Sequence, residues 1–399
     1  MLPELKSAIL RRVMWALGVI GARARRLKSP PAPGAVRRIA VLQFGGIGDM
    51  VLTTAALREL ARAYPHARIS VVCSDRGNAA FLSRFPFVDE VRAFNIYAMD
   101  TRAVGTGRFW TESFAMARWL RSRRFGLLVN FHNPFLVDWF LVEFLLVAFS
   151  NARFAVGVNP RFLPHRSVYH RWISEDRLDG QHYKDFFLDV TGLLGVEPLS
   201  RDTTFPLGTE DAAYAHALLG TQAVEPPAVA VIHPGGSAPH NHWPTARYGE
   251  LSRALSRRRL QVFVVGSDAD RGTGAAIAGI DPNARNLAGT ASISQTAALI
   301  ARAAVFVGND SGPLHIAVAV NTPAVGLIGG GSPRFHLYSR ENIRVVKKAM
   351  RCAPCQDRTC PSTECMRRIA VGDVLAAVDQ LLALPGSQPL SPMAVAADG

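Results

Sequence analysis

The sequence predicts an α/β protein built from two doubly wound domains. Strand-like apolar runs alternate with helix-length segments through both halves of the chain, which is typical of βαβ units and mostly parallel sheets. The chain has 399 residues, which is more than one ordinary core accommodates. Hydrophobic residues make up 49% of it, so the chain can bury large cores and differs in composition from disordered proteins.

Each half supplies five predicted strands. Those of the first half are residues 38–44, 69–74, 91–94, 127–131 and 154–158, and those of the second are 229–233, 261–266, 305–308, 324–328 and 343–346. We expect a first Rossmann-like domain over 37–206, a linker over 207–227, a second such domain over 228–384 and a disordered tail over 385–399. Because doubly wound domains bind ligands at the carboxyl ends of their strands, we expect the two domains to face a central cleft.

A basic segment precedes the first domain. Nine basic residues and one acid, Glu4, lie between residues 1 and 38, within a chain of net charge +14. They flank an apolar run, 13–22, about half as long as a membrane-spanning helix. We interpret 1–36 as an amphipathic helix and linker on an anionic membrane surface, with a poorly ordered basic extension as the alternative.

Secretion and nucleic-acid binding fit this basic segment less well. Arg23, Arg25 and Arg26 follow the apolar run where a cleaved signal peptide needs a neutral start, which disfavours secretion. The charge is concentrated before the folded region and no nucleic-acid-reading motif accompanies it, which disfavours nucleic acid as a partner. We therefore expect a cytoplasmic protein, peripheral on the inner face of the cytoplasmic membrane.

A glycine loop follows the first strand and leads into an amphipathic helix. It contains Gly45, Gly46 and Gly48 and ends in Asp49. This is not the dinucleotide fingerprint, because no third glycine follows within the helix and an acid stands at its start. Asp49 is either a helix cap or a general base for an acceptor hydroxyl, kept ionised by the helix N-terminus.

Two stretches of the second half also follow a strand. In the first, His233-Pro234-Gly235-Gly236-Ser237, backbone N–H groups and Ser237 are suited to hold a phosphate. The second, His240-Asn241-His242-Trp243-Pro244, starts the next helix at Trp243-Pro244. Its two histidines lack a nearby third ligand in the sequence, which disfavours a catalytic metal.

The strongest local signal is Gly308-Asn309-Asp310-Ser311-Gly312-Pro313-Leu314-His315, directly after a strand. Proline suits the first helical position, so the N–H groups of Ser311 and Gly312 would form a diphosphate site at a helix start. His315 either donates to the leaving phosphate or caps internally. Asp270, after another strand, either binds ribose hydroxyls or is a solvated loop acid.

Four cysteines follow the spacing C-x2-C-x4-C-x4-C near the end of the second domain. They are Cys352, Cys355, Cys360 and Cys365. In a cytoplasmic chain this spacing is compatible with a reduced structural loop, a structural zinc site or a disulfide or redox pair. Nothing in the spacing indicates a catalytic role.

The segment 135–149 is apolar nearly all round. A buried helix accounts for this pattern, and so would a surface for the lipid acceptor, the membrane or a second subunit. In each case we expect Asp138 and Glu143 to lie only at an edge of it.

Three of these stretches resemble the signatures of glycosyltransferase family 9, the ADP-heptose:lipopolysaccharide heptosyltransferase family. They are residues 38–49, the 233–237 turn with Trp243-Pro244, and residues 308–315, in the order and spacing of that family across 37–384. The resemblance implies a GT-B fold and an inverting mechanism that needs no metal or other cofactor. It also implies an ADP-sugar donor, typically ADP-heptose, bound mainly by the second domain.

The implied reaction moves a heptose or a related sugar to a hydroxyl of the lipopolysaccharide core or another lipid-linked glycan. Carried over by position, the resemblance makes Asp49 the base, Ser237 a phosphate contact and Asp270 a ribose contact. The full set of expected substrate-binding residues is Gly45, Gly46, Gly48, Gly235, Gly236, Ser237, Asn241, Trp243, Asp270, Asp310, Ser311, Gly312 and His315.

Two departures from the family pattern qualify the implied function. Asn241 stands where many members have a lysine that would offset the charge of the leaving diphosphate, and Arg334 or Arg271 would have to substitute for it. The loop 329–333 reads Gly-Gly-Gly-Ser-Pro, where the family more often has Gly-Pro-Thr-Asp/Ser-Pro. The alternative function is therefore a membrane-associated nucleotide-sugar-binding protein with weak or lost catalysis.

Overall fold

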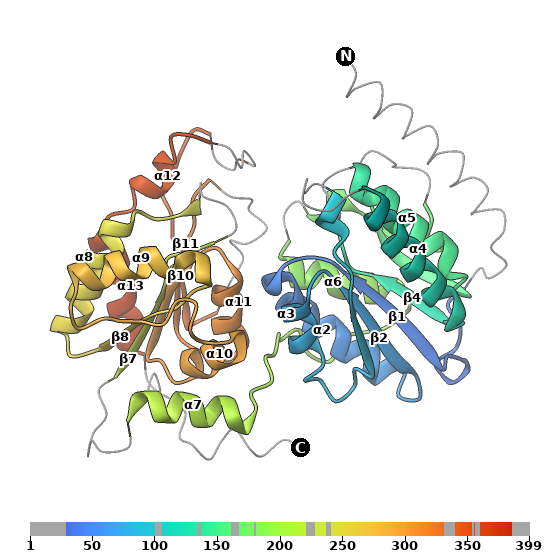
Figure 1. Ribbon diagram of the computed structural model, residues 1–399, viewed down its shortest axis with the longest axis horizontal. Coiled ribbons are helices and arrows are strands. Elements are labelled where there is room, and N and C mark those ends of the chain that lie inside the picture. Colours follow the sequence, from blue (N-terminus) through green and yellow to red (C-terminus); the bar gives the residue numbers. More distant parts are fainter. Residues whose placement is uncertain are drawn as a thin grey trace. The chain divides into compact units, whose positions relative to one another are not determined.

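The computed structural model describes residues 29–99, 106–133, 137–160, 167–178, 181–220, 228–236, 241–330, 340–352, 355 and 360–384. The chain divides into two compact units, Met1–Asp202 and Thr203–Gly399, and each contains a six-stranded parallel sheet with helices around it (Figure 1). The predicted α/β class with two doubly wound domains is confirmed. The predicted basic helix over 1–28 and the predicted tail over 385–399 lie outside the described residues.

Unit 1 is a sheet in the order β3-β2-β1-β4-β5-β6. Its strands are β1 (Arg38–Gln43), β2 (Arg68–Cys73), β3 (Glu90–Ala93), β4 (Leu127–Asn130), β5 (Phe154–Asn159) and β6 (Arg171–Ser174). Its helices are α2 (Ile47–Ala63), α3 (Arg76–Leu82), α4 (Thr106–Ser122), α5 (Val137–Ser150) and α6 (Tyr183–Gly192), with short 3-10 segments η1 (Pro33–Ala35), η2 (Ile96–Met99) and η3 (Glu175–Leu178).

The alternation of side chains along β1 shows how both faces of this sheet are buried. Ala40 and Leu42 lie in one apolar cluster with residues of α4 and α5. Gln43 points the other way and donates to Thr53 of α2, with 2.9 Å between Nε2 and Oγ1. Helix α2 packs against α6, as α4 packs against α5. The central strands are therefore buried on both faces, as expected of a parallel sheet.

Unit 2 repeats this plan in the order β12-β11-β10-β7-β8-β9. Its strands are β7 (Val229–His233), β8 (Gln261–Val264), β9 (Arg285–Asn286), β10 (Val305–Asn309), β11 (Ala324–Leu327) and β12 (Ile343–Val346). Its helices are α7 (Thr209–Leu219), α8 (Thr245–Arg257), α9 (Arg271–Ile280), α10 (Ile293–Ala301), α11 (Gly312–Ala319), α12 (Glu364–Arg367) and α13 (Val371–Leu382), with the 3-10 segment η5 (Asp268–Asp270).

All ten predicted strands are present, with ends within two residues of those expected. The edge strands β6 and β9 were not predicted. Only Ile173 of β6 is buried, and β9 is two residues long, so neither carries the apolar run by which a strand is recognised.

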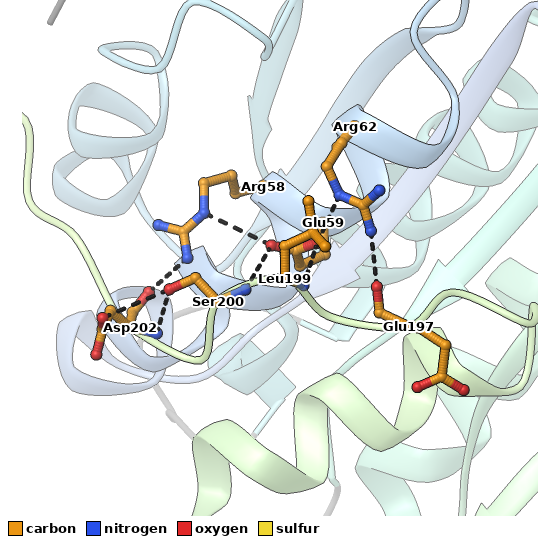
Figure 2. Close-up of polar contacts among 7 residues, drawn as sticks. All are labelled: Arg58, Glu59, Arg62, Glu197, Leu199, Ser200 and Asp202. Atoms are coloured by element: carbon orange, nitrogen blue, oxygen red, sulfur yellow. Dashed lines mark hydrogen bonds and ion pairs between the residues drawn. The ribbon is translucent and has the colours of Figure 1, made fainter.

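The last segment of unit 1 is fastened to helix α2 by Glu59 (Figure 2). This side chain is 2% exposed and accepts hydrogen bonds from the backbone N–H groups of Leu199 (3.2 Å) and Ser200 (3.3 Å) and from Arg62 Nε (2.8 Å). Burial raises the pKa of Glu59, but these donors outweigh it and lower the pKa below its ordinary value. Glu59 is therefore ionised in the folded protein near neutral pH.

Two arginines of the same helix hold the same segment (Figure 2). Arg58 donates to the carbonyl oxygen of Asp202 at 2.9 Å, and Arg62 donates to that of Glu197 at 2.7 Å. The chain thus leaves unit 1 along the helix whose first turn carries Asp49. The stretch 207–227, which we expected to be a linker, includes helix α7, which packs against α10 of unit 2.

Candidate active site

Asp49 lies in the first turn of α2, where its carboxylate turns back to the start of the helix. Oδ2 accepts a hydrogen bond from the backbone N–H of Gly46 at 2.9 Å. A Cβ atom on Gly45 would overlap the Asp49 carboxylate, so a glycine is required there for the loop and the carboxylate to lie together. Gly46 is the N-cap of α2, so Asp49 is not the helix cap that one interpretation held. It stands three residues later, where its carboxylate serves the helix start, and it remains partly exposed.

The loop around Gly45 is held from both sides of β1. Gln43 accepts from the Gly45 N–H at 3.1 Å, and Ser74 and Asn78 each donate to the Gly45 carbonyl at 3.2 Å. The Thr53 hydroxyl accepts a hydrogen bond from the Gln43 side-chain amide and donates to the carbonyl of Asp49 at 2.7 Å. These bonds fix the backbone that carries Asp49.

The electrostatics of Asp49 reflect two opposing effects. Burial raises the pKa of Asp49, while the nearby His132 and the Gly46 N–H lower it, and burial prevails, so that the pKa lies above its ordinary value. The expected helix N-terminus contributes, but it is not the main influence. A carboxylate with a raised pKa is a stronger base than an ordinary aspartate, provided that it is ionised.

His132 follows β4 and forms a buried pair with Glu143 of α5. Its Nδ1 is hydrogen-bonded to Glu143 Oε1, and its Nε2 lies 3.0 Å from the Tyr97 hydroxyl. Glu143 is fully buried, although we expected it at the edge of an apolar helix. That expectation was wrong because the polar partners of Glu143 come from the end of a strand outside its own helix.

In unit 2 the turn after β7 and the helix start after β10 lie together. Ser311 Oγ is 3.0 Å from His233 Nδ1. Burial lowers the pKa of His233 to about 4, although Asp270 acts to raise it, so His233 is neutral at neutral pH. Gly235 packs against the Asp270 carboxylate, and a Cβ at Gly235 would overlap it.

Asn309 connects these parts from the end of β10. Its Nδ2 donates to the carbonyls of Pro234 (2.7 Å) and Gly235 (3.1 Å), and its Oδ1 accepts from the Tyr248 hydroxyl (2.9 Å) and the Trp243 N–H (3.3 Å). The residue is fully buried. One side chain therefore holds the glycine turn, α8 and the end of β10 in register.

Helix α11 begins at Gly312, with Ser311 just before it and Pro313 in the first turn, as predicted. His315 is 4% exposed, and its Nε2 lies 3.9 Å from Asp310 Oδ1. The first N–H groups of a helix are without partners inside it and favour anions. This end of unit 2 is thus suited to bind a diphosphate.

The chain is similar in sequence to known proteins of one family. The model of "Glycosyltransferase family 9 (heptosyltransferase)" matches residues 165–366. Lipopolysaccharide heptosyltransferase 2 of Salmonella typhimurium is 34% identical over 335 residues, which are 78% of this chain and 88% of that protein. The chain belongs to glycosyltransferase family 9. It is therefore a glycosyltransferase.

Two further comparisons extend over most of the chain. Lipopolysaccharide heptosyltransferase 3 of Escherichia coli is 28% identical over 351 residues, covering 84% of this chain and 96% of that protein. The structure of E. coli ADP-heptose lipopolysaccharide heptosyltransferase II has the same fold, with a TM-score of 0.68, 22% identity and coverage of 86% of this chain and 98% of that one.

Several expected site residues of this family 9 member have other partners or lie outside the described residues. Trp243 is 2% exposed, packs edge-on against Tyr248 in the core of unit 2 and donates to the Ile369 carbonyl at 2.9 Å. Asp270 accepts from the N–H (2.8 Å) and the hydroxyl (2.7 Å) of Ser267. Ser237 lies outside the described residues.

Arg271 is one candidate for supplying the charge that Asn241 lacks. That guanidinium is paired with Asp268, with 2.6 Å between Nη2 and Oδ1, and the other candidate, Arg334, lies outside the described residues. Asn241 Oδ1 is buried and has no hydrogen-bond partner among the residues that the structure describes. A buried acceptor without a donor costs about 1–3 kcal/mol, so this amide favours a donor from a ligand or a neighbouring loop.

The four cysteines line one small hollow beside Gly330. None of the four forms a disulfide, and the Gly330 N–H donates to Cys365 Sγ at 3.1 Å. Within the described ranges, no three histidine, cysteine or acidic side chains are arranged to hold a metal ion. The structure therefore gives the predicted zinc site no support.

Sequence reasoning did not select Gln43, His132, Glu143 or Asn309. Three of them stand at or just after the carboxyl ends of predicted strands, where ligands of doubly wound domains bind. That position was the available signal for Gln43, His132 and Asn309. Nothing in the sequence marks Glu143, which lies within an apolar helix.

Proposed function

We propose that this enzyme transfers a heptose or a related sugar from an ADP-sugar to a hydroxyl of the lipopolysaccharide core or another lipid-linked glycan. The relatives named lipopolysaccharide heptosyltransferases 2 and 3 support this substrate class, and the E. coli protein of similar fold is named for ADP-heptose. The observation that carries the proposal is the Asp49 carboxylate, which the glycine loop presents at the start of α2 with a raised pKa.

In the proposed reaction, Asp49 takes the proton of the acceptor hydroxyl while the oxygen of that hydroxyl forms a bond to the anomeric carbon of the donor sugar. The bond from that carbon to the diphosphate breaks, and its electron pair leaves with ADP. Attack from the face opposite the leaving group inverts the anomeric centre. Asp49 supplies the base, so deprotonation of the acceptor hydroxyl does not require a metal ion.

The donor is proposed to bind at the strand ends of unit 2. The N–H groups at Ser311 and Gly312 would receive the diphosphate, His315 would donate to it, and Asp270 would contact the ribose. Ser237 and the N–H groups of Gly235 and Gly236 complete the proposed phosphate contacts. The helix start and the neutral His233 provide uncharged polar groups at this site.

The proposal is tested by ADP release from purified full-length protein given ADP-heptose and a lipid A–Kdo acceptor. We expect release that depends on the acceptor and continues in EDTA, and a product whose anomeric configuration, measured by NMR, is opposite to that of the donor. Release that requires a divalent metal, or retention of configuration, would contradict the mechanism. Absence of ADP-heptose binding in calorimetry would contradict the proposal that ADP-heptose is the donor.

Asn241 favours a second candidate function, a nucleotide-sugar-binding protein with weak catalysis. An amide in place of the family lysine leaves the departing diphosphate with one cation fewer. If this function holds, the wild type binds ADP-heptose without turnover, and Asn241→Lys gains acceptor-dependent ADP release. Turnover by the wild type would rule it out.

The enzyme is further proposed to work at the cytoplasmic membrane surface, where a lipid-linked acceptor is found. The basic segment 1–36 supports this, and so does an apolar groove between α4 and α5 in which Phe114 is 64% and Phe149 48% exposed. In the part of the chain that the structure describes, no helix is both long and apolar enough to cross a bilayer.

A further inference from the structure

Among the described residues of unit 1, His132 and Glu143 form a buried acid–base pair that the proposed mechanism leaves without a role. Glu143 uses both carboxylate oxygens, because Oε1 bonds His132 and Oε2 accepts from Asn130 Nδ2 at 2.9 Å. Asn130 in turn accepts a hydrogen bond from the backbone N–H of His132 at 3.0 Å, and its side-chain amide donates to the Tyr169 hydroxyl at 2.6 Å. The imidazole is therefore held in one orientation, with Nδ1 toward Glu143 and Nε2 toward Tyr97.

Stability alone does not explain this pair. The two side chains lie among apolar residues, including Val142, Phe144 and Leu146 of the same helix, with exposed fractions of 5% and 0%. Burying a carboxylate and an imidazole costs several kcal/mol per ion, and well-packed apolar side chains in their place often stabilise a protein as much or more. Such clusters at the end of a strand are more common where they act on a reacting group.

The reacting group next to the pair is Asp49. Strands β1 and β4 are adjacent and parallel, and the Phe131 N–H donates to the Leu42 carbonyl at 2.9 Å, just before both chains leave the sheet. The ring of Phe44 packs edge-on against His132, with centroids 5.5 Å apart. His132 lowers the pKa of Asp49 and so opposes the effect of burial.

Other titratable groups surround these two residues. Tyr97 of η2 faces His132, and Asp75, which caps α3, contacts the Gly45 loop through Ser74 and Asn78. Tyr169 is linked to Glu143 through Asn130. Of these side chains, only the imidazole of His132 is able to carry a positive charge, which a phenol or a carboxyl group cannot.

We propose that His132, held in place by Glu143, is a positioning residue for Asp49 that keeps the carboxylate ionised until the acceptor hydroxyl arrives. The inference rests on the proposed role of Asp49 as the base. Glu143 acts one step further away, because its carboxylate is hydrogen-bonded to the imidazole and fixes its orientation. The loss of either side chain should therefore make Asp49 harder to ionise.

The test is a titration of the aspartate carboxyl carbons of the full-length protein by 13C NMR, in which Asp49→Asn identifies the Asp49 signal. In His132→Gln we expect the Asp49 midpoint to move to higher pH by roughly one unit, as the removal of a nearby opposite charge predicts. Glu143→Gln should move the Asp49 midpoint in the same direction. This second variant serves as the test if His132→Gln does not fold. Tyr169→Phe, in the same cluster, is the control and should leave the midpoint in place.

The pH profile of kcat/KM provides the second readout. Its acid limb should move upward with the Asp49 midpoint, and the rate of His132→Gln should recover as the pH rises. An unmoved midpoint in both variants, or a rate lowered equally at every pH, would overturn the positioning role. Full transfer activity in Asp49→Asn would instead refute the role of Asp49 as the base. Failure of the base role and failure of the positioning role are therefore distinguished by different variants.

Discussion

At the scale of single residues, Asp49 and Gly45 depend on each other. The carboxylate occupies the space that a Cβ at Gly45 would need, and its Oδ2 accepts from the next N–H, that of Gly46. The glycine is thus required by the position of the carboxylate, and no left-handed backbone is involved. A repositioned carboxylate would no longer face the acceptor hydroxyl in the proposed reaction.

Gly45→Ala should therefore lower the rate of transfer strongly. The added methyl group must displace the Asp49 carboxylate, and a shift of about 1 Å at a catalytic group costs on the order of 100-fold in rate. The measurement is kcat for ADP release with saturating donor and acceptor.

Gly192→Ala is the matched control for this change. Gly192 ends α6 in the same unit, and nothing lies within 4 Å of a Cβ placed there. Its rate should stay near that of the wild type. If both variants had equal rates, the carboxylate position would not matter for turnover.

At the scale of elements, the sequence predicts a strand or a helix correctly where that element carries its own local signal. The ten apolar strands and the start of α11 could be predicted because local apolar runs and Pro313 mark them. Features that depend on contacts between distant segments could not. The indole of Trp243 is buried and donates to the carbonyl of Ile369, far along the chain, and Glu143 of α5 finds its partner just after β4.

Helix α2 also holds the end of unit 1, and Glu59 is the residue on which this attachment depends. Glu59→Gln should lower the free energy of unfolding of unit 1 by about 1–3 kcal/mol, since it removes a buried charge that accepts three hydrogen bonds. Thermal or urea unfolding measures the loss. Glu112→Gln, which breaks the exposed pair with Arg108, is the control and should cost less than about 0.5 kcal/mol.

The effect of Glu59 should also depend on pH. Its pKa is lower in the folded protein than its ordinary value of 4.5, so the stability it contributes is present above that pH and is lost as the pH falls toward the folded pKa. The difference between wild type and Glu59→Gln should shrink below pH 4.5. A constant difference would mean that the carboxylate charge is not the cause.

At the scale of the whole molecule, the net charge of +14 and the apolar groove of unit 1 are compatible with one partner, an anionic membrane surface. Phe114 and Phe149 are two of the few large apolar side chains that are exposed among the described residues, and both line the groove. Arg118 and Arg121 are exposed on the same helix, α4. Exposed aromatic side chains with arginines on the same helix are suited to contact the acidic headgroups of a membrane. They are less suited to contact a basic segment such as 1–36 of this chain.

Phe114→Ser combined with Phe149→Ser should weaken binding to anionic vesicles by about tenfold or more, because each phenyl ring contributes about 1.5–3 kcal/mol when fully withdrawn from water and part of that when half withdrawn. Flotation with phosphatidylglycerol-containing vesicles measures the bound fraction, and neutral phosphatidylcholine vesicles should bind little. Leu199→Ser removes a side chain that is 78% exposed outside the groove and should have no effect. Equal binding by all variants would assign the membrane contact elsewhere.

The central claim is that the Asp49 carboxylate is the base of a sugar transfer, and single-turnover ADP release by Asp49→Asn tests it most directly. Asp211→Asn is the matched control, because Asp211 stands at the same position of α7 and accepts the Gly208 N–H at 3.0 Å, as Asp49 accepts that of Gly46. We predict that Asp49→Asn loses about 100-fold or more in rate while its affinity for ADP-heptose is kept, and that Asp211→Asn turns over like the wild type. Equal rates for the two variants would show that Asp49 only caps its helix and would contradict the proposed mechanism.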